Sequence, residues 1–530
     1  MTGEAQALKG GGNNPGFRSK SIMVQGTASS VGKSVITAGL CRIFKQDGYE
    51  VAPFKSQNMA LNSFITREGK EMGRAQVVQA EAAGKEPSIE MNPILLKPTT
   101  DKKAQVILQG QVFGNMSAVE YHDFKPRLAD MVREVYDGLA AKNDIVVLEG
   151  AGSPAEINLR DKDIVNMGMA GIADSPVILV GDIDKGGVFA SLAGTMLLLS
   201  EEEKARVKGV IINKFRGDVE ILKPGLKMLE DIIKVPVLGV LPYTKLNIED
   251  EDSLAEKFAA AGRSTKAGID IAVVKTPRMS NFTDFNALEN LEDVEVRYVD
   301  RLSELGSPDV ILLPGSKNTI EDMLFLRNSG MEQEIKRLHE KGAVIFGICG
   351  GYQMLGREIE DPCRTESDLL KIGGMGLLNT KTLFRQRKTT TQVSGAVTEG
   401  CGLLEGLKGS RMEGYEIHMG TTEYLEDCRT FLVIDRVLEK EETSVGGITN
   451  KEGNVFGTYI HGIFDNLDFT RGFINNLRRR KGLAGLENAG VHDFKAYKDL
   501  QYDRLADMLR ANLDMDKIYE IAGLKKREQL

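Results

Sequence analysis

Cysteine is scarce in this chain of 530 residues, and its few copies are scattered. Their number is odd and no two stand in CxxC spacing, which argues against a disulfide framework and against a zinc site. We therefore expect a protein of a reducing compartment, the cytoplasm. The cysteines are Cys41, Cys349, Cys363, Cys401 and Cys428.

Long apolar stretches and an excess of positive charge are also missing. The longest uncharged stretch, residues 186–200, is shorter than the ~20 residues that a membrane-spanning helix needs. Residues 1–20 contain no apolar segment of the signal-peptide kind. The formal net charge is −8 and the charges are dispersed, so no basic surface for nucleic acid is indicated. The expected partners are small molecules, without nucleic acid or membrane, and a homo-oligomer is left open.

The length suits two or three domains, and apolar runs alternate with amphipathic segments along most of the chain. This alternation is typical of parallel sheets covered by helices, so the predicted fold class is α/β. We expect a leader at residues 1–20, a first domain at 21–245, a linker at 246–268, a second domain at 269–483 and a charged helical tail at 484–530. The predicted strands are residues 21–25, 50–54, 144–149, 176–181, 208–213 and 236–240, then 269–275, 294–299, 309–313 and 343–348, with a helix over 321–341.

Residues 25–34 predict a phosphate-binding loop between a strand and a helix. In such a loop the backbone N–H groups face an anion, the Lys33 ammonium reaches the outer phosphates, and the Ser34 hydroxyl can bind Mg²⁺. Five residues rather than four separate Gly26 from Gly32, so Thr27 stands where the ordinary pattern has its first glycine. The predicted cofactors are ATP and Mg²⁺.

Two residues at the ends of other strands complete the expected nucleotide site. Glu149 ends the apolar strand 144–149 and can share Mg²⁺ with Ser34, because this ion usually takes only one or two protein carboxylates. A capping role at the strand end is the alternative. Asn213 ends another strand and is a weaker candidate, whose amide could read a purine edge.

Polar loops after the strands supply candidate substrate contacts, because ligands of open parallel sheets bind at the carboxyl ends of the strands. The loop of residues 55–63 is rich in amides and has one cation, which suits carboxylates. Residues 156–166 carry several charges between small residues. Either loop could instead be a solvated connection. The candidates are Lys55, Gln57, Asn58, Asn62, Asn158, Asp161 and Asp163.

A second motif places Cys349 between glycines at a predicted strand-to-helix junction, a sharp turn that exposes a nucleophile. A buried structural cysteine is the alternative. His461 closes a late strand and is the best candidate base, with His418 as a second choice or as a residue that orients substrate. Gly315 and Gly350 are expected to offer N–H groups to an oxyanion. The histidines expected to be uninvolved are His122, His339 and His492.

Taken together, these motifs resemble the cobyric acid synthases of cobalamin biosynthesis. The resemblance spans about residues 21–480 and rests on segments 25–34, 55–63, 149–159, 182–189 and 414–420. The phosphate loop alone is also similar to that of dethiobiotin synthetases, which implies phosphate binding by Gly32, Lys33 and Ser34 and metal binding by Glu149. The implied fold is a P-loop NTPase-like, dethiobiotin synthetase-like domain followed by a class I glutamine amidotransferase-like α/β domain.

The resemblance implies a reaction as well. ATP would convert the b, d, e and g carboxylates of adenosylcobyrinic acid a,c-diamide into acyl phosphates, and ammonia from glutamine would displace the phosphate. Class I glutaminases carry a Glu two residues after the catalytic His, whereas Ile463 stands there in this chain. A backbone carbonyl or Glu416 could orient His461 instead.

Two other functions are weighed. A partition-type P-loop ATPase would have an extra lysine five residues before Lys33, where this chain has Ala28. A cobyrinic acid a,c-diamide synthase would use the same chemistry on a different corrinoid. The segments at 55–63 and 156–163 favour the cobyric acid synthases over the a,c-diamide synthases.

Overall fold

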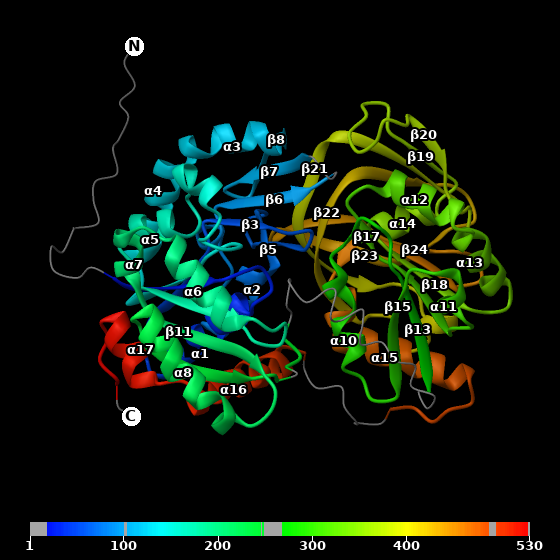
Figure 1. Cartoon of the computed structure of the whole chain (residues 1–530). Helices are drawn as coiled ribbons and strands as arrows, with labels where there is room; N and C mark the ends of the chain where they lie inside the picture. Colours follow the sequence, from blue (N-terminus) through cyan, green and yellow to red (C-terminus); the bar gives the residue numbers. More distant parts are fainter. Residues whose placement is uncertain (1–18, 100–102, 245, 249–267, 487–493, 528–530) are drawn as a thin grey trace, which may run out of the picture.

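The computed structural model describes residues 19–99, 103–244, 246–248, 268–486 and 494–527. Figure 1 shows two lobes side by side. The first lobe comprises the described residues between 19 and 248 together with 494–527, and the second lobe comprises residues 268–486. Most of the predicted leader and linker, and His492, lie outside the described residues.

The first lobe is built on a parallel sheet of six strands in the order β12-β11-β10-β1-β9-β2. All six strands predicted for this part of the chain form, with small differences at their ends. Their bounds are β1 (Lys20–Gly26), β2 (Val51–Phe54), β9 (Ile145–Glu149), β10 (Val177–Asp182), β11 (Val207–Phe215) and β12 (Val237–Pro242).

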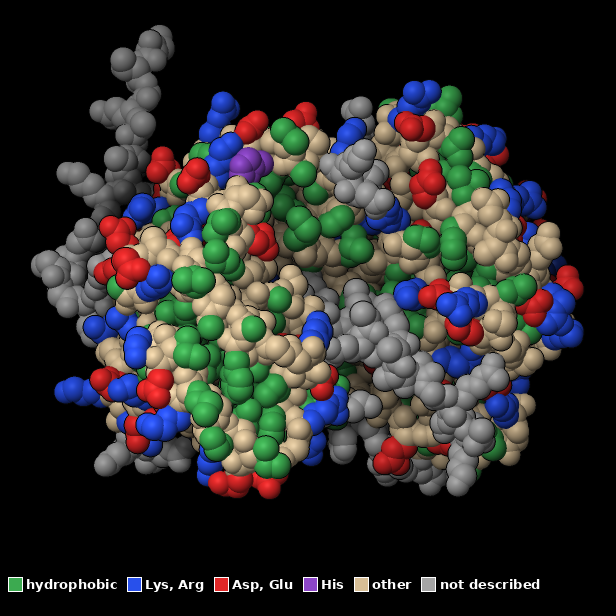
Figure 2. All heavy atoms as spheres, in the orientation of Figure 1, with side chains coloured by type: hydrophobic (Ala, Val, Ile, Leu, Met, Phe, Trp, Pro, Cys, Tyr) green, Lys and Arg blue, Asp and Glu red, His purple; other side chains and the backbone are tan. Residues whose placement is uncertain are grey.

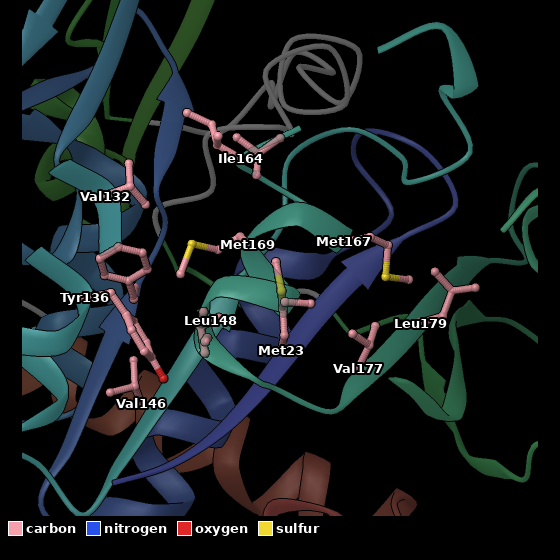
Figure 3. Close-up of a cluster of buried hydrophobic side chains, with 14 of the residues drawn as sticks. Met23, Val132, Tyr136, Val146, Leu148, Ile164, Met167, Met169, Val177 and Leu179 are labelled. Atoms are coloured by element: carbon pink, nitrogen blue, oxygen red, sulfur yellow. The ribbon is translucent and has the colours of Figure 1, made fainter. Parts of the chain in front are cut away.

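Helices cover both faces of this sheet, so its strands are apolar on both sides. Figure 3 shows one face, where Met23, Leu148 and Leu179 from three neighbouring strands meet helical side chains. Their neighbours in the chain, such as Val24 and Val147, point to the opposite face and pack there. The helices are α1 (Lys33–Gln46), α2 (Arg74–Ala82), α4 (Ala129–Ala140), α5 (Met167–Ala173), α6 (Val188–Leu198), α7 (Glu201–Arg206) and α8 (Val219–Ile233).

A small module of mainly antiparallel strands between β2 and β9 was not predicted, and in it only β3 and β6 pair in parallel among the described strands. Its four-stranded sheet has the order β3-β6-β7-β8, and β4 pairs with β5 beside it. In Figure 1 this module lies against the second lobe. The bounds are β3 (Gln57–Met59), β4 (Ser63–Ile65), β5 (Glu71–Gly73), β6 (Ile94–Pro98), β7 (Lys103–Leu108) and β8 (Gln111–Ser117), followed by α3 (Ala118–Phe124).

The second lobe contains a mixed sheet whose parallel part has the order β15-β13-β16-β18-β25. The four strands predicted here form as β13 (Ile269–Val274), β15 (Val294–Val299), β16 (Val310–Leu313) and β18 (Val344–Ile348). An antiparallel part continues from β25 through β24, β23 and β21. A further strand, β22, pairs with β21 and with β26. The bounds are β21 (Thr380–Val397), β22 (Arg411–Tyr424), β23 (Arg429–Val437), β24 (Lys440–Thr449), β25 (Val455–Thr458) and β26 (Ile460–His461). Across the described residues, no helix combines the length and the apolar character that crossing a membrane requires.

One helix prediction in this lobe was wrong. Residues 321–341 do not form a single helix but belong to α12 (Thr319–Asn328) and α13 (Met331–Glu340). Gly330 between them has a φ of 77°, and a left-handed residue cannot continue an α-helix.

The C-terminal segment returns to the first lobe, as its red colour in Figure 1 shows. Helices α16 (Phe494–Asn512) and α17 (Met515–Ala522) pack on α1. Leu505 and Leu509 are fully buried there, and the Tyr519 ring meets Phe44 edge-on at 5.4 Å. The predicted helical tail is therefore helical, but one of its faces belongs to the core of the first lobe.

Apolar side chains also remain exposed on the first lobe, visible in green in Figure 2 over α6 and α8. The largest exposed fraction among them is 83 %, at Ile221. The others on these helices include Leu197, Met228 and Ile232. Exposed apolar patches often mark contact surfaces.

The packing of α16 leads to a stability prediction. We expect Leu509→Ala to destabilise the protein by about 2–5 kcal/mol, because it leaves a cavity between α16 and α1. Leu500→Ala on the same helix is the matched control, since Leu500 is exposed, and it should cost less than about 0.5 kcal/mol. Thermal unfolding followed by circular dichroism measures both. Equal unfolding temperatures for the two variants would contradict the buried role of α16.

Two candidate active sites and the interface between them

The predicted phosphate loop connects β1 to α1. Gly32 has a φ of 97°, and a Cβ there would lie 2.1 Å from Asn213 Nδ2, so only glycine fits. Asn213 Nδ2 donates to the Val31 carbonyl at 2.8 Å. The amide predicted to read a purine therefore braces the loop. Lys33 is buried, and its ammonium donates to the carbonyls of Ala28 at 2.9 Å and Gly152 at 3.2 Å.

Glu149 lies beside this loop, fully surrounded by protein. Its Oε1 accepts hydrogen bonds from Ser34 Oγ and from Lys55 Nζ, each at 2.8 Å. Its Oε2 accepts one from Gln79 Nε2 at 2.5 Å. Burial raises the pKa of this carboxyl, but Lys55 and the hydrogen bonds outweigh burial and hold the pKa below its ordinary value. Glu149 is therefore a carboxylate at neutral pH.

These residues fit a nucleotide with Mg²⁺. A serine hydroxyl and one ionised carboxylate oxygen lie 2.8 Å apart at the end of a glycine loop, and Mg²⁺ prefers such oxygen ligands together with substrate phosphates. Within the part of the chain that the structure describes, no group of three or more His, Cys, Asp or Glu could hold a metal ion. A metal at Ser34 and Glu149 would therefore need the phosphates as ligands.

The candidate substrate residues of the loop after β2 have several partners. Lys55 is paired with Glu149, and Gln57 Oε1 accepts from the Tyr121 hydroxyl at 2.6 Å. Asn58 is buried next to Gly73. Asn62 Oδ1 accepts from the Phe282 backbone at 3.3 Å, which is a contact with the second lobe.

The candidate residues after β9 differ in exposure. Asn158 and Asp161 are exposed on a short 3₁₀ turn. The Asp163 carboxylate instead accepts hydrogen bonds from the backbone of Val165 at 2.8 Å and of Gly168 at 2.9 Å. Asp163 thus holds the start of α5 in place, whereas Asn158 and Asp161 are open to a ligand.

Cys349 lies between β18 and the short helix α14 (Gly350–Leu355). Its φ is 53° and its ψ is −108°, a strained conformation for a residue other than glycine. Such strain is typical of nucleophile turns between a strand and a helix. The thiol lies 3.5 Å from the Ile417 carbonyl oxygen and lines a cavity.

His461 faces the same cavity, and a carboxylate from another part of the chain holds it. His461 Nδ1 lies 2.7 Å from Asp284 Oδ2, and the Gly462 N–H donates to Asp284 Oδ1 at 2.9 Å. Both side chains are buried. The expected orienting groups, a backbone carbonyl or Glu416, are not the partner of Nδ1. Asp284 belongs to a 3₁₀ turn (Phe282–Phe285) that precedes β15 in the chain, and it was not a candidate.

The charge of His461 follows from this contact. Burial lowers its pKa, but Asp284 raises it further than burial lowers it, and with a contribution from Cys349 the pKa is about 10. The ring is then an imidazolium at neutral pH. Its Nε2 makes no hydrogen bond of normal geometry among the described residues, but the Cys349 side chain is close enough to help raise the pKa. Tyr415 stacks on the ring at 5.3 Å. A proton on Nε2 therefore lies beside the Cys349 thiol at the cavity.

The remaining candidates of the second lobe surround this cavity. His418 lines it, its Nδ1 donates to the Gly420 carbonyl at 2.7 Å, and its ring stacks on Tyr459 at 3.7 Å. Gly315 lies next to the His461 ring, and Gly350 begins α14. His122 and His339 lie outside the cavity, on α3 and α13.

A buried ion-pair network joins the two lobes beside the cavity. Glu71 in the first lobe accepts from Lys97 Nζ at 2.9 Å and from Lys388 Nζ of the second lobe at 2.5 Å. Nearby, the Tyr415 hydroxyl donates to the Ser63 carbonyl at 3.1 Å, and Asn281 Nδ2 donates to the same oxygen at 3.2 Å. The loop that follows Lys55 therefore contacts the residues that flank His461.

Comparison with known proteins decides the family. Residues 22–254 match the family described as "CobQ/CobB/MinD/ParA nucleotide binding domain", and residues 270–469 match the "CobB/CobQ-like glutamine amidotransferase domain". The chain is 56 % identical over 502 residues to "Cobyric acid synthase" of Thermoanaerobacter sp. (strain X514), covering 94 % of this chain and 98 % of that protein. It is 58 % identical over 507 residues to "Cobyric acid synthase" of Clostridium botulinum (strain Loch Maree / Type A3), covering 95 % and 99 %.

The chain belongs to the cobyric acid synthases. It is therefore a glutamine amidotransferase-type ligase of cobalamin biosynthesis with a nucleotide-binding P-loop domain. The family resemblance seen in the sequence motifs is confirmed, and so is the predicted pair of α/β domains.

Three groups of residues at the cobyric acid synthase sites escaped sequence reasoning. They are Gln79 beside Glu149, Asp284 beside His461, and the network of Glu71, Lys97 and Lys388. None stands in a motif with functional spacing, since each reaches its partner from a distant segment. The one available signal is that two apolar residues, Phe282 and Phe285, flank Asp284 in the sequence. Both are buried, which holds the turn in place.

The Asp284–His461 contact gives a test of pH dependence. In Asp284→Asn the histidine loses the carboxylate that raises its pKa, so the alkaline limit of glutaminase activity should move from near pH 10 to lower pH. The contact between His461 and Asp284 also stabilises the folded protein. Its contribution to the free energy of unfolding is full below about pH 6.5, the ordinary pKa of histidine, and is lost as pH rises through 10. By analogy with loss of the orienting carboxylate in Ser-His-Asp triads, we expect turnover to fall roughly 10²–10⁴-fold at pH 7.

Ammonia release from glutamine, measured against pH, checks this prediction. Asp300→Asn, which changes a partly exposed carboxylate of the same lobe, is the control and should keep the wild-type profile. An unchanged alkaline limit in Asp284→Asn would show that Asp284 does not set the charge of His461.

Proposed function

We propose that the chain amidates the b, d, e and g carboxylates of adenosylcobyrinic acid a,c-diamide, using ATP and glutamine, to give adenosylcobyric acid. The observation that carries this proposal is the presence of two different sites in one chain. A phosphate loop with an ionised carboxylate suits carboxylate activation, and a buried Cys–His–Asp group suits release of ammonia from glutamine.

The site in the first lobe would activate the corrinoid carboxylate. Attack of a carboxylate oxygen on the γ-phosphorus of ATP breaks the bond to ADP and forms an acyl phosphate. Lys33 and the loop N–H groups would stabilise the charge on the transferred group. Mg²⁺ held by Ser34 and Glu149 would neutralise phosphate charge. Lys55 is tied to Glu149, so we propose that it positions this carboxylate as well as contacting substrate.

The site in the second lobe would release ammonia. The Cys349 thiolate attacks the side-chain amide carbon of glutamine, and the N–H groups of Gly315 and Gly350 stabilise the oxyanion. His461 gives its Nε2 proton to the departing amide nitrogen, and Asp284 holds the ring. Water then cleaves the thioester to give glutamate. Ammonia attacks the acyl phosphate, and inorganic phosphate leaves.

We also propose a division of labour along the chain. Residues 21–245, together with the C-terminal helices that pack on α1, would form the amidoligase domain. Residues 269–483 would form the glutaminase domain, and residues 246–268 would connect them. The proposed corrinoid contacts are Lys55, Gln57, Asn58, Asn158 and Asp161, with Asn62 acting at the interface and His418 facing glutamine.

A substrate assay separates this function from its nearest alternative. Purified protein with ATP, Mg²⁺ and glutamine should convert adenosylcobyrinic acid a,c-diamide to a product four amides richer, and should leave cobyrinic acid unchanged. Mass spectrometry of the corrinoid counts the amides directly. Consumption of cobyrinic acid alone would assign the chain to a,c-diamide synthesis instead, and ATP hydrolysis without amidation of either corrinoid would favour the ATPase alternative.

The two-site mechanism predicts a selective loss in Cys349→Ala. Amidation from glutamine should fall to background, since removing a covalent nucleophile can cost as much as ~10⁶-fold in turnover. High ammonium at mildly alkaline pH should still support ATP-dependent amidation, because the first site is intact. Cys401→Ala, at an exposed cysteine of the same lobe, is the control and should keep both activities. Equal loss with both nitrogen sources would disprove two separate sites.

A further inference from the structure

The cavity beside Cys349 is lined by charges that the proposed reaction does not use. Lysines 97, 317 and 388 and Glu366 line it together with Cys349 and His461. Two of these lysines, Lys97 and Lys388, share the carboxylate of Glu71. Each of these two lysines therefore already has a direct ion-pair partner in the interface.

Lys317 and Glu366 differ from that pair. Lys317 Nζ donates to the neutral Gln105 Oε1 at 3.1 Å, and the Glu366 carboxylate accepts from the Thr319 backbone N–H at 2.9 Å. Among the described residues neither is within ion-pair distance of an opposite charge. One cation and one anion without a direct ion-pair partner thus border the same half-buried space as the nucleophile, and each is a nearby opposite charge for the other.

We infer that Lys317 and Glu366 form a clamp for the α-amino acid end of glutamine, with Lys317 on the α-carboxylate and Glu366 on the α-ammonium. This inference rests on the proposed glutaminase function of the same cavity. A zwitterion presents one charge of each sign on one carbon, which matches one cation and one anion that line the cavity without a direct ion-pair partner. The side-chain amide of the ligand would then extend toward Cys349.

The electrostatics of the cavity agree with this assignment. Burial lowers the pKa of Lys317 to about 7, and the nearby Lys388 and Lys97 lower it as well. Burial raises the pKa of Glu366 to about 7, although the nearby Lys317 lowers it. Glu366 in turn raises the pKa of Lys317, but less than burial lowers it. Each group is therefore only partly stabilised in its charged form, and a bound zwitterion would bring an opposite charge into direct contact with both.

The clamp also explains how the cavity can admit a ligand. Its volume is about 30 Å³, which is close to the space of a single water molecule. Lys317 can leave the neutral Gln105 amide for a carboxylate, since a hydrogen bond to a charged group is stronger than one to a neutral group. Gln105 belongs to β7 of the first lobe, so the exchange would open the cavity at the interface.

The test compares glutamine with two analogues that each lack one charge. The analogue 4-aminobutanamide has no α-carboxylate, and 5-amino-5-oxopentanoate has no α-ammonium. Ammonia release by the full chain gives a KM for each compound. Lys317→Met should raise the KM for glutamine roughly 10–100-fold and leave the KM for 4-aminobutanamide unchanged, because that analogue never contacts Lys317.

The isosteric Glu366→Gln should show the complementary pattern, raising the KM for glutamine and not for 5-amino-5-oxopentanoate. Lys336→Met, at a lysine paired with Glu332 on α13, is the control and should match wild type throughout. Thermal unfolding reports whether each variant is folded.

Two outcomes would overturn the inference, and they differ from failure of the proposed function. A wild-type KM for glutamine in both variants contradicts the clamp alone. Equal increases for glutamine and both analogues mean that the residues shape the cavity without reading the charges. A wild-type protein that amidates with ammonium but releases nothing from glutamine contradicts the glutaminase assignment itself.

Discussion

The structure depends on a buried carboxylate that is shared between the lobes. Glu71 is withdrawn from water, and its two oxygens contact one lysine from each lobe. Burial raises the pKa of Glu71, but Lys388 and Lys97 together bring it well below the ordinary value. Removing one partner of such a buried group typically costs about 3–5 kcal/mol. The ion pairs therefore favour an arrangement of the lobes in which both lysines reach Glu71.

The same physical device recurs at each site. Glu149 is kept ionised by Lys55, and Asp284 is paired with the His461 imidazolium. In each case a carboxylate with a buried partner holds a functional group in one orientation and one charge state. Water could not do this, because it would solvate the charges in many arrangements. The enzyme thus achieves precise positioning through desolvated pairs placed at strand ends.

The interface also connects the two chemistries physically. The loop that begins at Lys55 contacts Glu149 at one end, and its Ser63 carbonyl receives hydrogen bonds from Tyr415 and Asn281 at the other. Tyr415 stacks on His461. A change in the first site that moves this loop would therefore reach the groups around the glutaminase histidine through a short chain of direct contacts.

Local pattern determined much of this protein. The parallel strands of both large sheets, the phosphate loop at Gly32 and Lys33, and the turn at Cys349 follow from hydrophobic alternation and from residues adjacent in the chain, since strands, loops and helix starts are set by short-range geometry. The antiparallel strands β21 to β24 were not predicted. The 56–58 % identity to cobyric acid synthases agrees with the motifs from which the family was inferred.

Tertiary structure alone decided which distant side chains meet. Asp284 reaches His461 across 177 positions, and Lys388 reaches Glu71 across 317. Ion pairs between such distant residues leave no periodic signal, because their partners are chosen by how the elements pack.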